Sequence, residues 1–320
     1  MITMYAKKLL KNTPVFDVYI LWTKYKVRKS PIKETKKNYH KFYGKSLNLK
    51  NPQLLSEKIQ YLKLFDYPKN SLVIKAADKY TIRDYLESKS FEKYEMPFIE
   101  IYNNPKEMNF EKLPQKFVLK KTNASGLNLI VKDKSKTSNK KLKKLMKKWL
   151  VSDYGDLSAE YHYSKGKNAI ICEPFIEELG NEYRMFMVGG KLAFVQVIIW
   201  YWNEKKDKAK EDDMIEGHRK HSRVHLDRQW KVIWKDEDVV KTEIPKPHFF
   251  NEMERVSSII SKDFPVVRID FNEVNDDIKI TELTFTPASG FLEILRQRPE
   301  LDKKLGTWID LEMFNEKNNQ

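Results

Sequence analysis

The chain has 320 residues, a mass of 38.2 kDa and a formal net charge of +15, a length sufficient for two domains or one large unit with subdomains. Its 41% hydrophobic and 33% charged residues are ordinary for a folded, water-soluble protein. Cys172 is the only cysteine, which excludes an internal disulfide bond and fits a reducing compartment.

The N-terminal region is strongly basic. Residues 1–50 hold thirteen lysines and arginines against Asp17 and Glu34, which places +11 of the total charge of +15 there. The apolar run at the start is interrupted at Pro14 and Asp17, so it is too short for a membrane span, and no signal-peptide cleavage site follows. We therefore expect a cytoplasmic protein in which residues 1–46 form a basic helical extension.

Two interpretations of this extension remain open. Its basic side chains alternate with aromatic ones, a combination that could meet an anionic membrane surface, where each basic residue contributes about 1 kcal/mol. The alternative is a solvated basic segment whose aromatic residues pack on the body of the protein. Nucleic acid is not expected as a partner.

A strand–turn–strand pattern follows the helical patterns of residues 51–105, with strands predicted at residues 117–120 and 129–132. Lys120 ends the first strand, and the turn has small residues at its tip. Small residues allow backbone N–H groups to approach phosphate oxygens. Neither a P-loop nor a G-x-G-x-x-G pattern is present, so the segment alone indicates a hairpin loop more often than a phosphate site.

Further elements are expected in the second half of the chain. They are an amphipathic, lysine-rich helix over residues 139–150 with Ser138 as N-cap, a buried strand within residues 168–176, a hairpin turning at Gly189 and Gly190, a mobile polar loop over residues 203–219, and a helix over residues 250–262. Helices combined with mostly antiparallel hairpins indicate an α+β fold.

The most informative segment is residues 266–285, in which two alternating stretches flank a polar Asn-Asp-Asp break, the pattern of a β-hairpin. With those three residues as the loop, Asp270 lies opposite Glu282 and Arg268 opposite Thr284, all on one face. Facing carboxylates repel each other unless a cation lies between them, and hard oxygen ligands suit Mg²⁺. On the hairpin alone, an ordinary arginine–carboxylate surface pair is the alternative.

The order of these elements resembles the ATP-grasp superfamily, and within it the TupA-like group linked to teichuronopeptide and other surface-polysaccharide biosynthesis. The resemblance covers roughly residues 50–310 and rests on several long blocks in one order. Those blocks are NPQLLSEKIQYLKL, AADKYTIRDYL, KFVLKKTNASGLNLIVKDKS, ICEPFIEE, EYRMFMVGGK, SKDFPVVRID, ITELTFTPASGF and LGTWIDL.

The resemblance implies an α+β ATP-grasp fold, with two α+β subdomains whose antiparallel sheets clamp ATP, preceded by the basic helical region. The implied division is an N-terminal extension (1–46), a helical pre-grasp region (47–112), an N-subdomain with the phosphate loop and hinge (113–175), and a C-subdomain with the Mg²⁺-binding hairpin (176–320).

The resemblance also implies roles for single residues in binding ATP. Lys79 and Lys120 are expected to contact the phosphates, and Ser125 and Gly126 to form a mobile loop over the γ-phosphate. The remaining implied contacts are Glu173, Pro174 and Ile176 as the hinge against which adenine lies, Glu182 for the ribose hydroxyls, and Arg184 for a phosphate or a substrate carboxylate.

Metal and substrate contacts are implied in the same way. Asp270 and Glu282 are the expected Mg²⁺ ligands, and Thr284 takes a position where many ATP-grasp enzymes carry an asparagine ligand, which leaves one or two Mg²⁺ ions open. Arg268 is expected to stabilise the transferring phosphoryl group, with Lys79 and Lys120 as the other catalytic residues. His221 and Arg223 are candidate substrate contacts, and a surface histidine is an equal alternative for His221.

The implied activity is an ATP- and Mg²⁺-dependent carboxylate–amine ligase that forms an amide through an acyl-phosphate. The expected substrates are a small-molecule or lipid-linked glycan carboxylate and an amine donor, and the expected location is cytoplasmic, at the inner membrane face if the extension binds lipid. The alternatives are a glycosyltransferase of the same pathway that uses Asp276–Asp277 or Asp212–Asp213, an ATP-dependent sugar kinase, and a non-catalytic polyanion-binding protein.

Overall fold

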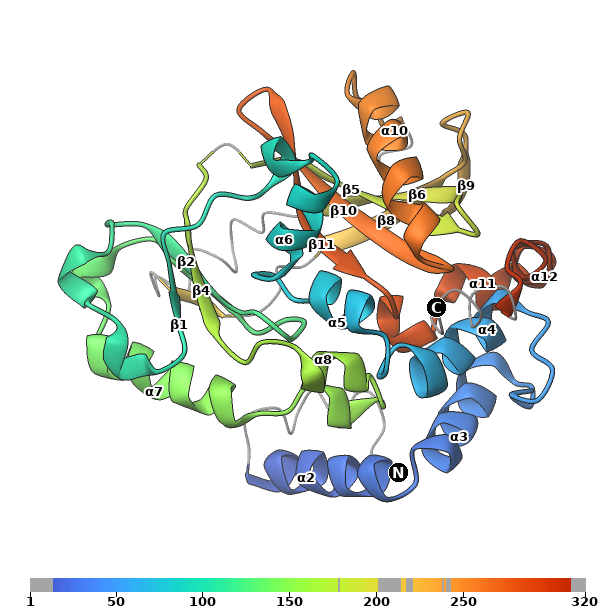
Figure 1. Ribbon diagram of the computed structural model, residues 1–320, viewed down its shortest axis with the longest axis horizontal. Coiled ribbons are helices and arrows are strands. Elements are labelled where there is room, and N and C mark those ends of the chain that lie inside the picture. The colour runs from blue at the N-terminus through green and yellow to red at the C-terminus, as the bar shows by residue number, and fades with distance from the viewer. Residues whose placement is uncertain are drawn as a thin grey trace.

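The computed structural model describes residues 14–177, 179–200, 214–216, 221–237, 239 and 243–311. Within them the chain forms two antiparallel sheets that lie next to each other, with helices packed around both (Figure 1). The predicted α+β class is confirmed. The chain leaves the first sheet at Pro174 and enters the second at Leu179, so the expected adenine hinge lies at the crossing between the sheets.

The first sheet has the strand order β1-β4-β2-β3-β7. Its strands are β1 (Glu100–Tyr102), β2 (Phe117–Lys121), β3 (Asn128–Val131), β4 (Ile170–Pro174) and β7 (Met214–Glu216). Helix α7 (Asn139–Val151) covers it, because the apolar stripe of Leu142, Met146 and Trp149 packs into one cluster with the strands. Ser138 caps this helix as predicted, accepting a hydrogen bond of 3.4 Å from the Lys141 amide.

The second sheet has the strand order β11-β10-β5-β6-β8-β9. Its strands are β5 (Leu179–Val188), β6 (Lys191–Trp200), β8 (His221–Leu226), β9 (Val232–Lys235), β10 (Val266–Val274) and β11 (Asp277–Thr284). One face of the β10–β11 hairpin, with Val267, Ile269, Leu283 and Phe285, is buried in the main core as predicted. Helix α10 (Phe250–Ile260) packs on β5 and β6.

Short helices complete this core, and several of their apolar residues belong to the same cluster as the second sheet. They are α4 (Leu55–Tyr61) with the π-helical turn Leu62–Asp66, α5 (Ser71–Ala77), α6 (Ile82–Ser88), α8 (Tyr161–Lys165), α11 (Glu293–Gln297) and α12 (Pro299–Gly306). The 3₁₀ turns are Glu92–Tyr94, Pro105–Glu107, Phe110–Lys112, Lys134–Lys136, Gly155–Leu157, Ser261–Asp263 and Pro287–Gly290.

One prediction needs correction. Part of the stretch expected to be a polar loop, Met214–Glu216, is the edge strand β7, and its backbone pairs with β3 of the first sheet. The rest of that stretch, residues 203–213 and 217–219, lies outside the described residues. The second half of the chain therefore contributes a strand to the sheet that carries the predicted phosphate loop.

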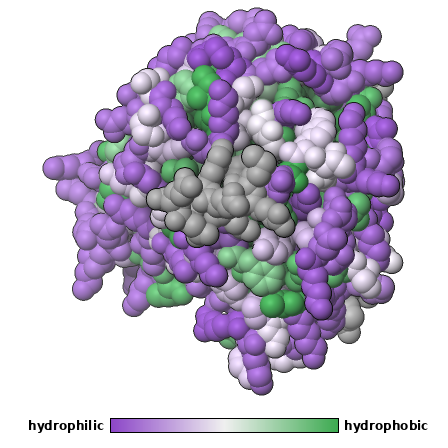
Figure 2. All heavy atoms as spheres, turned by 45° about the vertical axis from the view of Figure 1, so that its right-hand side comes forward, coloured by the Kyte–Doolittle hydropathy of each residue, from purple (hydrophilic) through white to green (hydrophobic). Residues whose placement is uncertain are grey.

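The basic extension is helical where the structure describes it, with α2 (Pro14–Lys29) and α3 (Pro31–Tyr43). Pro31 at the first position of α3 marks the break between them, and Gly44 ends α3 in the left-handed region at a φ of 71°. Both helices contact the body, α3 through the Tyr39 hydroxyl, 2.8 Å from Ser56 Oγ. No helix among the described residues is long and apolar enough to cross a bilayer. Hydrophilic residues dominate the face shown in Figure 2, and the apolar ones form small separate patches.

Candidate active site

The β10–β11 hairpin has the predicted register at its functional end. Asp270 pairs with Glu282 and Arg268 with Thr284. The turn is tighter than predicted, because only Asn275 and Asp276 form it, both with positive φ (49° and 57°), while Asp277 already pairs with Val274.

A β-bulge reconciles this shorter turn with the predicted pairing. The register shifts by one residue where Asp270 and Phe271 face Glu282 and Ile280, which leaves Thr281 as the extra residue. Its hydroxyl donates a hydrogen bond of 3.2 Å to the carbonyl of Asp270. The two-residue turn and the bulge together give the pairing that a three-residue loop would have given.

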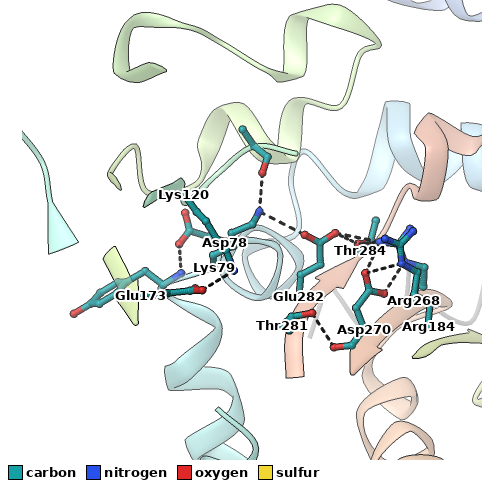
Figure 3. A network of polar contacts seen from close by, with 12 residues as sticks. Asp78, Lys79, Lys120, Glu173, Arg184, Arg268, Asp270, Thr281, Glu282 and Thr284 are labelled. Atoms are coloured by element: carbon teal, nitrogen blue, oxygen red, sulfur yellow. Dashed lines mark hydrogen bonds and ion pairs between the residues drawn. The ribbon is translucent and has the colours of Figure 1, made fainter. Parts of the chain in front are cut away.

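Arg268 bridges the two facing carboxylates through ion pairs with both (Figure 3). Its Nε and Nη2 are each 2.6 Å from an oxygen of Asp270, and Nη2 is 3.2 Å from Glu282 Oε1. All three side chains lie in or at the edge of the protein interior, where such charge-assisted contacts are strong. The cation that the facing carboxylates require is therefore supplied by the protein's own guanidinium.

The two carboxylates have opposite pKa shifts. Burial raises the pKa of Asp270 above its usual range, because loss of hydration outweighs the attraction of Arg268 and Arg184. Burial alone would also raise the pKa of Glu282, but Lys79 and Arg268 lower it below its usual range.

Thr284 positions Glu282. Its hydroxyl donates a hydrogen bond of 2.5 Å to Glu282 Oε1 and accepts one of 3.0 Å from Arg268 Nη2. The hydroxyl is thus shared between the carboxylate and the guanidinium, on the same face as both.

Lys79 links this hairpin to the predicted phosphate loop. Its Nζ donates a hydrogen bond of 2.6 Å to the carbonyl of Ala124 and lies 3.5 Å from Glu282 Oε2, as Figure 3 shows. Its backbone amide also donates to the carbonyl of Thr122 at 3.0 Å. One residue therefore holds the loop of the first sheet against a carboxylate of the second.

The loop itself connects β2 and β3. Gly126 has a φ of 74°, a conformation that glycine adopts without strain, and Ala124 is buried beneath the tip. Ser125 and Gly126 are partly exposed at the tip, and the hydroxyl of the partly buried Tyr154 is in hydrogen-bonding contact with the Ser125 side chain. Tyr154 was not anticipated from the sequence.

Lys120 contacts the strand that leads to the hinge. Its Nζ is 2.5 Å from Glu173 Oε2, and the Glu173 side chain is almost fully buried. Pro174 ends β4, and Ile176 follows it at the crossing between the sheets, both partly buried. The predicted phosphate lysine and the predicted hinge thus lie in direct contact.

Glu182 and Arg184 lie on β5, next to β10. Arg184 Nε is 2.6 Å from Glu182 Oε1 and 3.6 Å from Asp270 Oδ2, so this ion pair extends the polar cluster across a third strand. Asn272 pairs with Glu182 in the sheet and is buried, and its Nδ2 has no hydrogen-bond partner among the described residues. A buried donor of this kind requires a partner, which a nucleotide hydroxyl could supply.

The polar face continues over two more strands. Arg184 donates to Gln196 of β6 at 3.2 Å, and Gln196 Nε2 is 2.8 Å from His225 Nε2 of β8. Burial lowers the pKa of His225 to about 3, so its ring is neutral. Gln196 and His225 were not anticipated, because their importance depends on which strands become neighbours.

His221 and Arg223 lie on the same face of the second sheet as the carboxylates. Cross-strand partners share a face, and β8 pairs in register with β6, which pairs in register with β5. Arg223 forms a two-pronged ion pair with Asp236, at 2.9 Å from Nε and 2.8 Å from Nη2. The structure thus places both residues on the face of the sheet that carries the carboxylates, three strands away from β10, with Arg223 paired to Asp236.

The carboxylates of the site fit a Mg²⁺ ion that is also coordinated by a nucleotide. Among the described residues no group of three or more His, Cys, Asp or Glu side chains is arranged to hold a metal alone. Mg²⁺ usually takes one or two protein carboxylates and completes its coordination with phosphate oxygens and water. Asp270 and Glu282 provide such a pair, adjacent to the lysines expected at the phosphates.

Two antiparallel sheets with this site between them have the ATP-grasp architecture expected from the sequence. The chain belongs to the TupA-like ATP-grasp family, whose model matches residues 57–310. No curated protein matches the chain.

Several solved structures are similar to it. They include D-alanine–D-alanine ligase from Bacillus anthracis (17% identity, TM-score 0.41, covering 78% of this chain and 71% of that one), D-alanine–D-alanine ligase from Helicobacter pylori (14%, 0.39, 80% and 69%) and an L-amino acid ligase from Bacillus licheniformis (12%, 0.43, 73% and 49%).

Proposed function

We propose that the protein is an ATP- and Mg²⁺-dependent carboxylate–amine ligase that forms an amide through an acyl-phosphate. The observation that carries the proposal is the polar cluster of Asp270, Glu282 and Arg268, which Lys79 joins to the small-residue loop. Membership of an ATP-grasp family supports it.

The proposed reaction has two steps. A carboxylate oxygen of the substrate attacks the γ-phosphorus of ATP, and the bond to the departing ADP oxygen breaks. The amine then attacks the acyl carbon, phosphate leaves, and the amine loses a proton as the amide forms. Both steps depend on positioning and charge stabilisation, without a covalent bond to the protein.

Different residues of the site would bind the phosphates, stabilise the developing charge and hold the metal. Lys79 and Lys120 bind phosphate oxygens as flexible point charges, and the loop at Ser125 and Gly126 covers them. Arg268 stabilises negative charge on the transferring phosphoryl group. Asp270 and Glu282 would hold Mg²⁺, which when bound neutralises phosphate charge and polarises the phosphoryl group.

The proposed substrate is a sugar acid or an amino acid that belongs to a surface polysaccharide, of the capsule or teichuronopeptide type, or to its lipid-linked precursor. The support is the family to which the chain belongs. A lipid-linked substrate would bring the enzyme to the inner membrane face as a peripheral protein. The glycosyltransferase alternative finds no support at Asp276, which lies in the hairpin turn, or at Asp277, which pairs with Lys279. Its other aspartate pair, Asp212–Asp213, lies outside the described residues.

Binding of ATP tests the site directly. Thermal unfolding is measured with ATP, with and without Mg²⁺, for the wild type and for the variants Asp270→Asn and Glu282→Gln. We expect a Mg²⁺-dependent rise in Tm that both variants lose. Asp277→Asn is the matched control, since Asp277 is a carboxylate on the same hairpin that lies outside the cluster. Stabilisation by UDP-sugars alone, or by heparin alone, would contradict the proposal.

Product analysis separates ligase from kinase. With a panel of uronic acids and amino acids plus hydroxylamine, a ligase releases phosphate and forms a hydroxamate from the acyl-phosphate. A sugar kinase produces ADP and a phosphorylated sugar, with no hydroxamate. ATP binding without hydroxamate on any carboxylate, together with a stable phosphosugar, would replace the ligase proposal by the kinase one.

A further inference from the structure

Helix α2 presents an apolar stripe to solvent. Of the eleven large apolar residues that are exposed in the described part of the chain, five lie on this one helix, each between 54% and 66% exposed. They are Val15, Val18, Leu21, Trp22 and Tyr25. Their spacing of three and four residues places them along one side of the helix.

The opposite side of α2 is fixed to the protein. Val27 is buried, and its carbonyl accepts a hydrogen bond of 3.3 Å from the Tyr161 hydroxyl. Lys24 Nζ donates 2.7 Å to the carbonyl of Asp153, and Arg28 forms an ion pair with Asp156. A surface helix normally turns its apolar stripe inward, so these contacts hold α2 in an unusual orientation with apolar side chains outward.

Basic side chains lie at the C-terminal end of this stripe and on the helix that follows. Residues 14–43 contain eight lysines and arginines against Asp17 and Glu34. Lys26 Nζ lies over the Trp22 ring, 2.9 Å from its centroid. At the junction of α2 and α3, Ile32 lines a hollow together with Lys33 and Lys36. Exposed aromatic and aliphatic groups flanked by lysines are the side-chain set of helices that lie in a membrane interface.

We propose that α2 is a membrane-docking helix, which lies on an anionic phospholipid bilayer with Val18, Leu21, Trp22 and Tyr25 in the headgroup region and the neighbouring lysines on the lipid phosphates. The helix has 16 residues and carries four cations, so it lies along the surface. Charge decides between this partner and a second copy of the chain, because two copies joined through this face would bring like charges together.

Helix α7 provides a second basic surface of a different kind. It carries six lysines, and the chain just after it contacts α2 through the hydrogen bond from Lys24 to Asp153. Its apolar stripe is buried in the core, so it can contribute charge attraction and no insertion. Apolar substitutions on α2 therefore distinguish docking by this helix from general attraction of a basic protein. This inference is independent of the ligase chemistry.

The test is sedimentation of the full chain with vesicles of phosphatidylcholine alone or of phosphatidylcholine mixed with phosphatidylglycerol. We expect binding to the anionic vesicles that weakens with salt. The double variant Leu21→Ser/Tyr25→Ser should bind at least about tenfold more weakly, because two apolar side chains no longer insert. Val232→Ser, at an exposed apolar residue of β9, is the control and should bind as the wild type does.

The inference fails if neutral and anionic vesicles bind equally, or if the double variant binds as tightly as the wild type while unfolding at the wild-type temperature. It fails also if neither vesicle binds and the protein is a dimer that the double variant converts to a monomer, since the face would then join two copies. Salt-sensitive binding that survives the double substitution would assign the attraction to lysines alone.

Discussion

Lys79 Nζ lies 3.5 Å from Glu282 Oε2, so a residue that precedes the first sheet reaches a carboxylate of the second. The same ammonium group donates to the Ala124 carbonyl at 2.6 Å. Since β2 and β11 belong to different sheets, this lysine connects the loop and the hairpin between which ATP is proposed to bind.

Replacing Lys79 tests that connection. Lys79→Met keeps most of the length of the side chain but removes its charge. We expect kcat/KM for ATP to fall about 100-fold, because a phosphate contact and the hydrogen bond to the loop are lost together. Steady-state kinetics with ADP detection measures it. Lys75→Met is the control, since Lys75 pairs with Asp84 at the surface. Equal kinetics for the two variants would remove Lys79 from the site.

Thr284 is expected to act by orienting Glu282. Thr284→Val preserves the shape but loses the hydroxyl that Glu282 and Arg268 share. We expect about a tenfold higher Mg²⁺ concentration for half of the ATP-induced rise in Tm, a cost of about 1.4 kcal/mol for one charged hydrogen bond. Thr284→Ser, which keeps the hydroxyl, should behave as the wild type. A normal Mg²⁺ requirement in Thr284→Val would show that the hydroxyl is dispensable.

His162 predicts a pH dependence of stability. Burial lowers its pKa from 6.5 to about 3, and neither ring nitrogen has a hydrogen-bond partner among the described residues. Between these values the unfolded chain binds a proton that the folded one does not. The neutral, buried His162 therefore contributes fully to the free energy of unfolding above pH 6.5, and this contribution is lost as the pH falls toward 3.

Urea unfolding of the wild type and of His162→Phe at pH 7 and pH 5 measures this loss. Phenylalanine suits the site because Tyr67, Tyr163 and Phe285 surround the ring. We expect the wild type to lose about 2 kcal/mol more than the variant over this interval, at about 1.4 kcal/mol per pH unit for one proton. Parallel losses in the two proteins would mean that His162 is protonated in the folded state.

The Gly189–Gly190 turn offers a matched pair of substitutions. Both glycines have positive φ, but a Cβ on Gly189 would lie 2.0 Å from the Trp308 carbonyl oxygen, whereas one on Gly190 would meet nothing within 4 Å. Gly190→Ala should cost about 1 kcal/mol of unfolding free energy from backbone strain alone. Gly189→Ala should cost clearly more, about 3 kcal/mol of unfolding free energy, because the backbone at Trp308 must move to make room for the Cβ. Similar Tm values for the two variants would show that the backbone at Trp308 shifts at little cost in free energy.

The sequence was sufficient where local pattern decides the structure. Alternation in residues 266–285 predicted which side chains share a face, and the pairing of Asp270 with Glu282 is confirmed. The tighter turn and the bulge at Thr281 escaped prediction, because both arrangements leave the same residues opposed at the functional end.

The sequence did not predict strand pairing between segments that are far apart in the chain. β7 is three residues long and acquires its strand conformation from β3, about 85 residues earlier in the chain, so its own sequence resembles a loop. The pairing of Arg223 with Asp236 and the contact of Gln196 with His225 likewise depend on strand order. A motif indicates the residues that are expected to contact a ligand, whereas the groups that hold those residues in place become visible only when the strand order is known.

The guanidinium between Asp270 and Glu282 also has a consequence for the order in which ligands arrive. A free Mg²⁺ ion approaching these carboxylates meets a pair whose repulsion is already relieved by Arg268, so it gains little by binding alone. Nucleotide phosphates change this balance, since they offer oxygen ligands to the metal and a new anionic partner to the arginine. We therefore expect Mg²⁺ to bind as a complex with ATP. The nucleotide-free protein is expected to bind Mg²⁺ only weakly, so that the Mg²⁺ concentration alone has little effect on it.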